Sequence, residues 1–156
     1  MGFDEDIKAI RELGGSPPTI ARNLTSDMLK ELMTHNKFDI VHLLVYVGQE
    51  NGDLIFSQHD KLNADGFGEL VKLTGARLVI LATCDSVVLG AKISRIANVI
   101  SAASQIEVPG FLSWEKSFFS VLAQKYTVAQ AYDISRSIAG LPFVLHLKAD
   151  LAFDVN

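Results

Sequence analysis

The only cysteine of this chain, Cys84, stands where a continuous apolar run ends and the polar pair Asp85-Ser86 begins. The run predicts a strand over residues 78–84 that is buried on both faces. Open α/β sheets place their reactive side chains just beyond the carboxyl ends of such strands, so Cys84 is a candidate nucleophile. The alternative is a structural role, because cysteine is among the most buried residue types and packs as a small hydrophobe.

A second predicted strand, residues 38–47, carries Tyr46 near its end. Helix signals separate the two strands, since Asn63 begins a helix and Gly75 ends it. Because a strand–helix–strand connection is right-handed, the two strands become parallel neighbours. The segments around Tyr46 and Cys84 are therefore expected at the same edge of the sheet.

The remaining elements are predicted from apolar spacing and turn residues. Helices are expected over residues 3–13, 26–35, 87–103 and 113–124, with a further helix capped by Thr127 that points Ala131, Ile134 and Ile138 inward. A short strand is expected at 54–56, and strands 38–47, 78–84, 104–108 and 143–147 should share one largely parallel sheet. This alternation predicts an α/β fold, a three-layer α/β/α sandwich. Trp114 and Phe118, at helical spacing, are expected in its core rather than in a ligand site.

Length and composition restrict the class of protein. At 156 residues the chain is expected to be a single domain, residues 1–156. Its formal net charge is −4 and its 14 basic residues are scattered, which argues against a nucleic-acid partner. No apolar run approaches the roughly 20 residues of a membrane span, so no membrane partner is expected. A chain with one cysteine has no internal disulfide, which favours the cytoplasm. None of the four histidines stands at a metal-ligand spacing, so neither a metal nor a cofactor is expected.

Two segments, residues 39–42 with the sequence DIVH and residues 81–86 with the sequence LATCDS, resemble the CHAT family of caspase-like domains. In that family the first strand ends in the pattern D-[I/V]-x-H-x-x-x-H-G. The second ends in a small residue, cysteine, an acidic residue and serine or threonine. The second histidine and the cysteine are the family's catalytic dyad. The resemblance covers about residues 20–140, since the segments around Phe118-Phe119 and 127–131 are also similar, and it implies a caspase-like sandwich.

Carried over residue by residue, the resemblance puts Cys84 at the nucleophile and Asp85 and Ser86 at the two positions after it. Tyr46 falls on the dyad histidine, and Val47 falls on the glycine that follows. A thiol with a pKa near 8.5 needs a base or a nearby cation to become a thiolate at neutral pH, and a phenol that titrates near 10 does not serve. These residues are therefore expected to form a vestigial site with no functional catalytic residue.

His42 matches the first, non-catalytic histidine of the family pattern, and it belongs to the same vestigial site. It lies four residues before Tyr46, which is about 13 Å along a strand at about 3.3 Å per residue. That distance is too long for a hydrogen bond to the thiol of Cys84. His59, in the segment 49–62, stays open as another source of a base, as does a residue of a partner.

Caspase-like sandwiches begin with a central strand ahead of the first helix, whereas here a helix is expected from residue 3. The first strand is thus expected to be missing. Either it has been lost, or this chain is a fragment or subunit of a larger assembly that supplies it. An open position in a sheet favours strand addition by a protein partner or by a second copy.

Two functions compete. The first is a catalytically degenerate caspase-like module, a pseudo-peptidase that acts by protein–protein interaction, and the resemblance implies a bacterial-type signalling or defence assembly as its setting. The second is an active cysteine endopeptidase of the CHAT type, with Cys84 as nucleophile and the backbone amides after it as oxyanion donors. Tyr46 and Val47 favour the first function, and the retained Cys84-Asp85-Ser86 favours the second. A nucleotide-binding α/β domain is disfavoured, because the chain has no glycine-rich phosphate loop.

Overall fold

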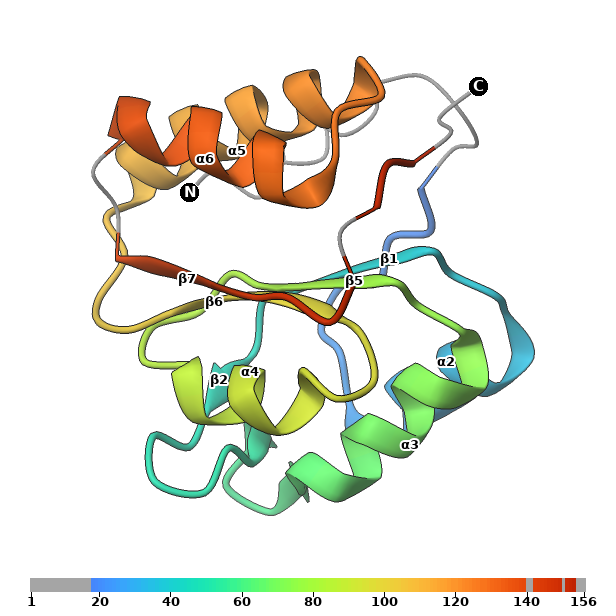
Figure 1. Cartoon of the computed structure of the whole chain (residues 1–156). Coiled ribbons are helices and arrows are strands. Elements are labelled where there is room, and N and C mark those ends of the chain that lie inside the picture. The colour runs from blue at the N-terminus through green and yellow to red at the C-terminus, as the bar shows by residue number, and fades with distance from the viewer. Residues whose placement is uncertain (1–17, 140–141, 150, 154–156) are drawn as a thin grey trace. The chain divides into compact units, whose positions relative to one another are not determined.

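The computed structural model describes residues 18–139, 142–149 and 151–153. They belong to two compact units that interleave along the chain. The first, here called the sheet unit, comprises residues 21–105 and 142–149, and the second comprises the described parts of 1–20, 106–141 and 150–156. All candidate site residues lie in the sheet unit, which contains every labelled β-strand of Figure 1.

The larger sheet has four strands in the order β1-β5-β6-β7. They are β1 (Ile40–Leu43), β5 (Leu78–Leu81), β6 (Asn98–Ala102) and β7 (Phe143–His146). β1, β5 and β6 are parallel, and β7 runs antiparallel to β6. Every residue of β5 is buried, which explains its continuous apolar sequence. The predicted α/β fold with a largely parallel sheet is confirmed.

Three helices, α2 (Ser26–His35), α3 (Ala64–Thr74) and α4 (Val87–Ile93), lie on one side of this sheet (Figure 1). Alternate strand residues point to that side, and with the helices they form one apolar core. Its members include Leu29, Met33, Phe67, Leu70, Val71, Leu89 and Ile93 from the helices and Val41, Leu43, Val79, Leu81 and Val99 from the strands. These helices make one covering layer, and the second layer of the expected sandwich stays a prediction.

Local capping explains why α2 and α3 begin, and why α3 ends, where the sequence predicts. The Thr25 side chain accepts a hydrogen bond from the Met28 N–H at 3.2 Å, and that of Asn63 accepts one from the Gly66 N–H at 2.8 Å. Gly75 ends α3 with a φ of 78°, a left-handed conformation that glycine adopts without strain.

A second, three-stranded antiparallel sheet in the order β2-β3-β4 corrects the expected strand over 38–47. Its strands are β2 (Tyr46–Val47), β3 (Leu54–Ser57) and β4 (Asp60–Leu62), and β3 confirms the short strand expected at 54–56. β1 ends at Leu43, and the chain then changes sheets. Val45 and Val47 still pack against the same core. The alternation of apolar residues therefore continues past Leu43, and the sequence does not show where β1 ends and β2 begins.

The helix expected over 87–103 is confirmed only for residues 87–93, and the strand expected over 104–108 is wrong. α4 ends at Ile93, and residues 98–102 form β6, whose Val99 and Ile100 are fully buried between β5 and β7. Tertiary pairing outweighs the local helical spacing here. Glu107 is instead the N-cap of a helix in which Pro109 occupies the first turn, where its missing N–H costs nothing.

The second unit contains two helices, α5 (Val108–Ala123) and α6 (Val128–Ala139). Trp114 and Phe118 are fully buried on α5, as predicted, with stacked rings whose centroids are 5.1 Å apart. At the start of α6, Thr127 and Gln130 each accept a hydrogen bond from the other's backbone N–H, a capping box. The cap predicted at Thr127 is therefore confirmed.

The inward direction expected for Ile134 is wrong, because its side chain is 43% exposed. Among the α6 residues up to 136, whose side chains the structure describes, Val128, Ala131, Tyr132 and Ser135 are buried, and Ile134 lies beside that stripe. Ile138, also expected to point inward, lies outside these described side chains. Ala131 is buried as expected.

The helix expected over 3–13 lies outside the described residues, so the absence of a first strand stays a prediction. Among the described strands, β1 ends the larger sheet on one side and β7 ends it on the other. Within the described ranges, no helix has both the length and the apolar character that crossing a bilayer requires.

We expect Phe118→Ala to lower the free energy of unfolding by about 3–5 kcal/mol, since it removes a fully buried ring and leaves a cavity against Trp114. Denaturant titration followed by fluorescence of Trp114, the only tryptophan, measures the loss. Ser120→Ala, an exposed position on the same helix, is the control and should change the value by less than about 0.5 kcal/mol. Equal stability of the two variants would contradict the core assignment.

Candidate functional site

The strand predicted over 78–84 is too long: β5 ends at Leu81, and Cys84 lies beyond its carboxyl end with its side chain exposed. The chain stays paired with β1 for one residue after the strand, because the Ala82 N–H donates to the Leu43 carbonyl at 3.0 Å. It then turns, and Asp85 takes a φ of 53°, in the left-handed region that aspartate tolerates better than most residues. The turn presents the Cys84 thiol to solvent before α4 begins.

Ser86 fixes this turn to the neighbouring strand. Its N–H donates to the Ala102 carbonyl at 2.8 Å, and its buried hydroxyl oxygen accepts from the Ala102 N–H at 3.0 Å. One residue earlier, the Asp85 N–H donates to the Ser104 carbonyl at 3.3 Å. Ser86 therefore has a structural role, because its side chain extends the pairing of β6 and holds the loop that carries Cys84.

Tyr46 follows the neighbouring strand β1 at the position that corresponds to Cys84 after β5. β1 and β5 pair Leu43 with Leu81, and Tyr46 and Cys84 each follow that pair by three residues. However, Tyr46 belongs to β2, where it pairs with Ile55, and its side chain is 81% exposed.

The next residue, Val47, pairs with Leu54 on the opposite face of the small sheet, which packs on the core. The outer face of the same sheet brings Tyr46, Ile55 and Lys61 into line across the three strands.

The two candidate histidines occupy different places. His42 lies in β1 opposite Ile80, four positions before Cys84 in the register of the two strands, and it is half-buried. His59 is exposed in the turn between β3 and β4. Neither is in the segment that directly follows β1 or β5.

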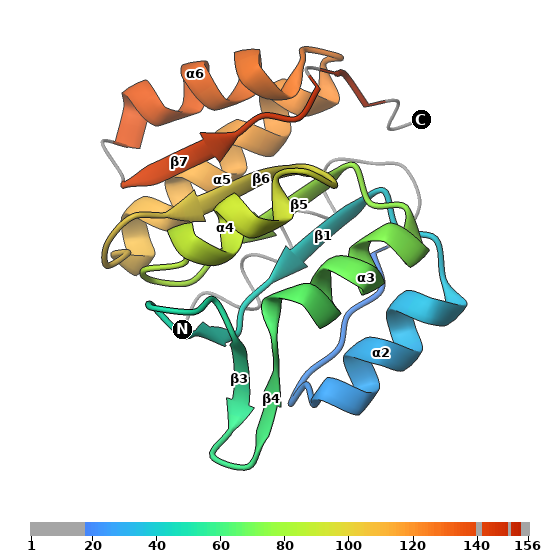
Figure 2. The same cartoon turned by 60° about the horizontal axis from the view of Figure 1, so that its bottom comes forward.

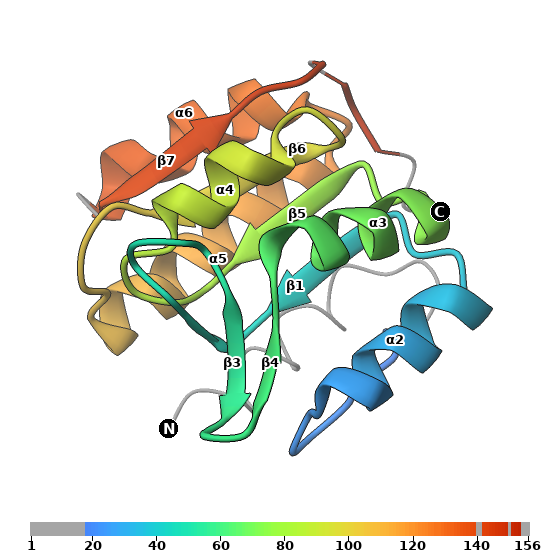
Figure 3. The same cartoon turned by 90° about the horizontal axis from the view of Figure 1, so that it is seen from below.

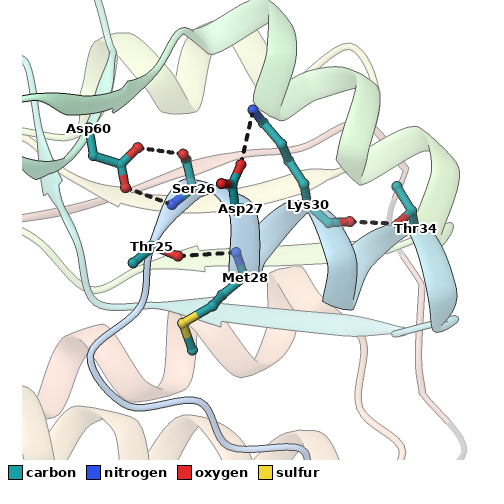
Figure 4. Close-up of polar contacts among 7 residues, drawn as sticks. All are labelled: Thr25, Ser26, Asp27, Met28, Lys30, Thr34 and Asp60. Carbon is teal, nitrogen blue, oxygen red and sulfur yellow. Dashed lines mark hydrogen bonds and ion pairs between the residues drawn. The ribbon is translucent and has the colours of Figure 1, made fainter.

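The residue after His59 makes a polar contact that the sequence did not predict (Figure 4). One carboxylate oxygen of Asp60 accepts the backbone N–H of Ser26 at 3.0 Å, and the other accepts the Ser26 hydroxyl. The hydroxyl and then the N–H of Ser26 hold the pKa of Asp60 below its ordinary value, because both bonds favour the charged form.

A serine–histidine pair was also missed. The Oγ of Ser101 on β6 lies 2.9 Å from the Nε2 of His146 on β7. Gly90 of α4 covers the pair so closely that a Cβ at that position would come within 2.8 Å of both atoms. Ser101 is fully buried, so its hydroxyl cannot reach a substrate, and the pair is a packing contact. The glycine within α4 was the one sequence signal of this close approach.

Among the described residues, no group of histidine, cysteine, aspartate or glutamate side chains is arranged to hold a metal ion. No protein-family model matches the sequence, and no curated protein matches it either.

We expect Ser86→Ala to lower the free energy of unfolding by about 1–3 kcal/mol, because it leaves the buried Ala102 N–H without its acceptor. The Ala102 amide should also exchange with solvent faster. Ser94→Ala is the control. It removes a hydroxyl at the end of α4 that donates to the Ala91 carbonyl at 2.7 Å in an exposed position, and it should change the free energy of unfolding by less than about 0.5 kcal/mol. Similar losses in the two variants would show that Ser86 does not anchor the loop.

Burial lowers the pKa of His146 below the usual 6.5, so the folded protein favours the neutral imidazole. The unfolded chain therefore binds a proton at this position more readily, and stability should fall as the pH decreases through about 6.5. In His146→Gln this contribution disappears, whereas the other three histidines are retained. Urea titrations between pH 8 and pH 5.5 test this, and equal pH slopes for the two proteins would contradict it.

Proposed function

We propose that this chain is a catalytically degenerate caspase-like module that resembles the CHAT family and acts by binding another protein. The observation that carries the proposal is Tyr46. It occupies the position that the resemblance assigns to the catalytic histidine, and a phenol is a poor base at neutral pH. Its side chain is directed to solvent from β2.

The surface around Tyr46 suits protein binding better than hydrolysis. Tyr46 is 81% exposed, and tyrosine is among the side chains that contribute most to protein interfaces. Ile55 and Lys61 lie beside it on the same outer face, which gives apolar area next to one positive charge. An exposed aromatic ring beside a charged side chain is a composition that protein interfaces commonly use.

The partner is a protein or a second copy of this chain, and strand addition is one way in which it would bind. The larger sheet of the described residues ends in β1 and in β7, so its edges are the elements to which such a strand would be added. A single cysteine and an acidic composition fit a cytoplasmic setting, which we propose to be a signalling or defence assembly.

The alternative function is a working cysteine endopeptidase, and the exposed position of Cys84 beyond β5 favours it. The retention of Ser86 supports it less than the sequence suggested. Its bonds to Ala102 explain why a serine is needed there without any chemistry.

Photo-crosslinking tests the binding surface. A benzophenone amino acid at Tyr46, in the cells that normally produce the chain, should give a discrete protein adduct, because the partner covers that side chain. The same amino acid at Leu73, a 52% exposed position on α3, is the matched control and should give no such adduct. Absence of an adduct at Tyr46, or equal labelling at both positions, would contradict the proposal.

A cleavage assay on the unmodified protein tests the peptidase alternative. Incubation with unfolded protein substrates should give no cleavage above that of Cys84→Ala. Cleavage that depends on Cys84 would establish the endopeptidase function and remove the degenerate one.

A further inference from the structure

We infer that residues 46–62, which comprise β2, β3, β4 and their two turns, form a strap across the sheet unit. We infer further that the hydrogen bonds between Asp60 and Ser26 hold one end of this strap and that breaking them lets that end open. Figure 3 shows the strap extending from the neighbourhood of α4 to the first turn of α2. Its two ends are held by different kinds of interaction. That difference makes one end fixed and the other end able to open.

The end at α4 is held by backbone packing. The turn is closed by its own bonds, since the Gly48 N–H donates to the Asp53 carbonyl and the Gly52 N–H to the Gly48 carbonyl, each at 2.8 Å. Gly52 is buried with a φ of 77°, and a Cβ there would come within 3.1 Å of the Leu89 backbone. Lys92 of α4 adds a bond from its Nζ to the Asn51 carbonyl at 2.9 Å. Such close contact leaves this end little freedom.

The middle of the strap contributes apolar contacts that decrease along its length. Leu54 at the start of β3 is fully buried in the core. Phe56, nearer to the turn between β3 and β4, packs against the core but remains partly exposed. Leu62, which is also partly exposed, pairs with Leu54 at the other end of the hairpin, where β4 leads directly into α3 (Figure 2). The apolar anchorage is therefore strongest near α4 and weakest near α2.

The end at α2 is held by a single carboxylate at the surface. Both oxygens of Asp60 bond Ser26, one to the backbone N–H at 3.0 Å and one to the hydroxyl, and the turn between β3 and β4 is otherwise exposed (Figure 4). Ser26 is the first residue of α2, where a negative charge is favourable. Removing that carboxylate should free the tip of the β3–β4 hairpin, residues 55–61, to open beyond the Leu54–Leu62 pair, which the core and the start of α3 hold in place.

Hydrogen exchange of the whole chain at neutral pH tests the strap. In Asp60→Ala, we expect the amides of residues 55–61 to exchange about tenfold faster, whereas those of Leu54, of residues 48–53 and of α4 stay within about twofold of the unmodified protein. Asp60→Asn, which keeps one acceptor oxygen, should give a smaller change in the same amides. The result does not depend on whether Cys84 is active.

Thr25→Ala is the matched control, because it removes the bond from the Met28 N–H and leaves the Asp60 contact in place. It should accelerate exchange in the first turn of α2 only. If Asp60→Ala also accelerates exchange only in that turn, Asp60 is an ordinary helix cap and the inference is contradicted. A uniform increase over the sheet unit in Asp60→Ala and Asp60→Asn would overturn it equally, since the hairpin would not open on its own.

Discussion

The complete burial of β5 is the constraint on which the sheet unit depends. A strand with no exposed residue must have its backbone paired on both edges, and β1 and β6 provide that pairing in parallel. Parallel pairing requires a crossover for each neighbour, which α3 and α4 supply. It also aligns the carboxyl ends of the three strands, so the segments that follow Leu43, Leu81 and Ala102 come together at one edge.

The way the chain leaves that edge decides what the site can be. After β5, Ser86 ties the turn to β6, and Cys84 is exposed on a loop that is held at its far end. After β1, the chain does not end in a free loop. It enters β2, and pairing with Ile55 fixes Tyr46 on an outward-facing surface.

The small sheet connects this edge to the start of α2. Its inner face carries Leu54 into the core, while its outer face carries Tyr46. Its attachment changes along its length from backbone packing at Gly52 to one surface carboxylate at Asp60. Such a gradient means that local opening begins at the hairpin turn, because the free energy of opening follows the buried apolar area that is lost.

Elements whose signals are local could be predicted from the sequence. They are α2 and α3, with side-chain caps at Thr25 and Asn63 within three residues of the N–H they bind, and the apolar run of β5. The sequence predicted the α/β class for the same reason. Tertiary structure alone decided that residues 98–102 are a strand, that Tyr46 changes sheets, and that Asp60 meets Ser26 across 34 residues of chain. In each of these cases the partner is distant in sequence, so the deciding energy comes from pairing and burial that no local pattern records.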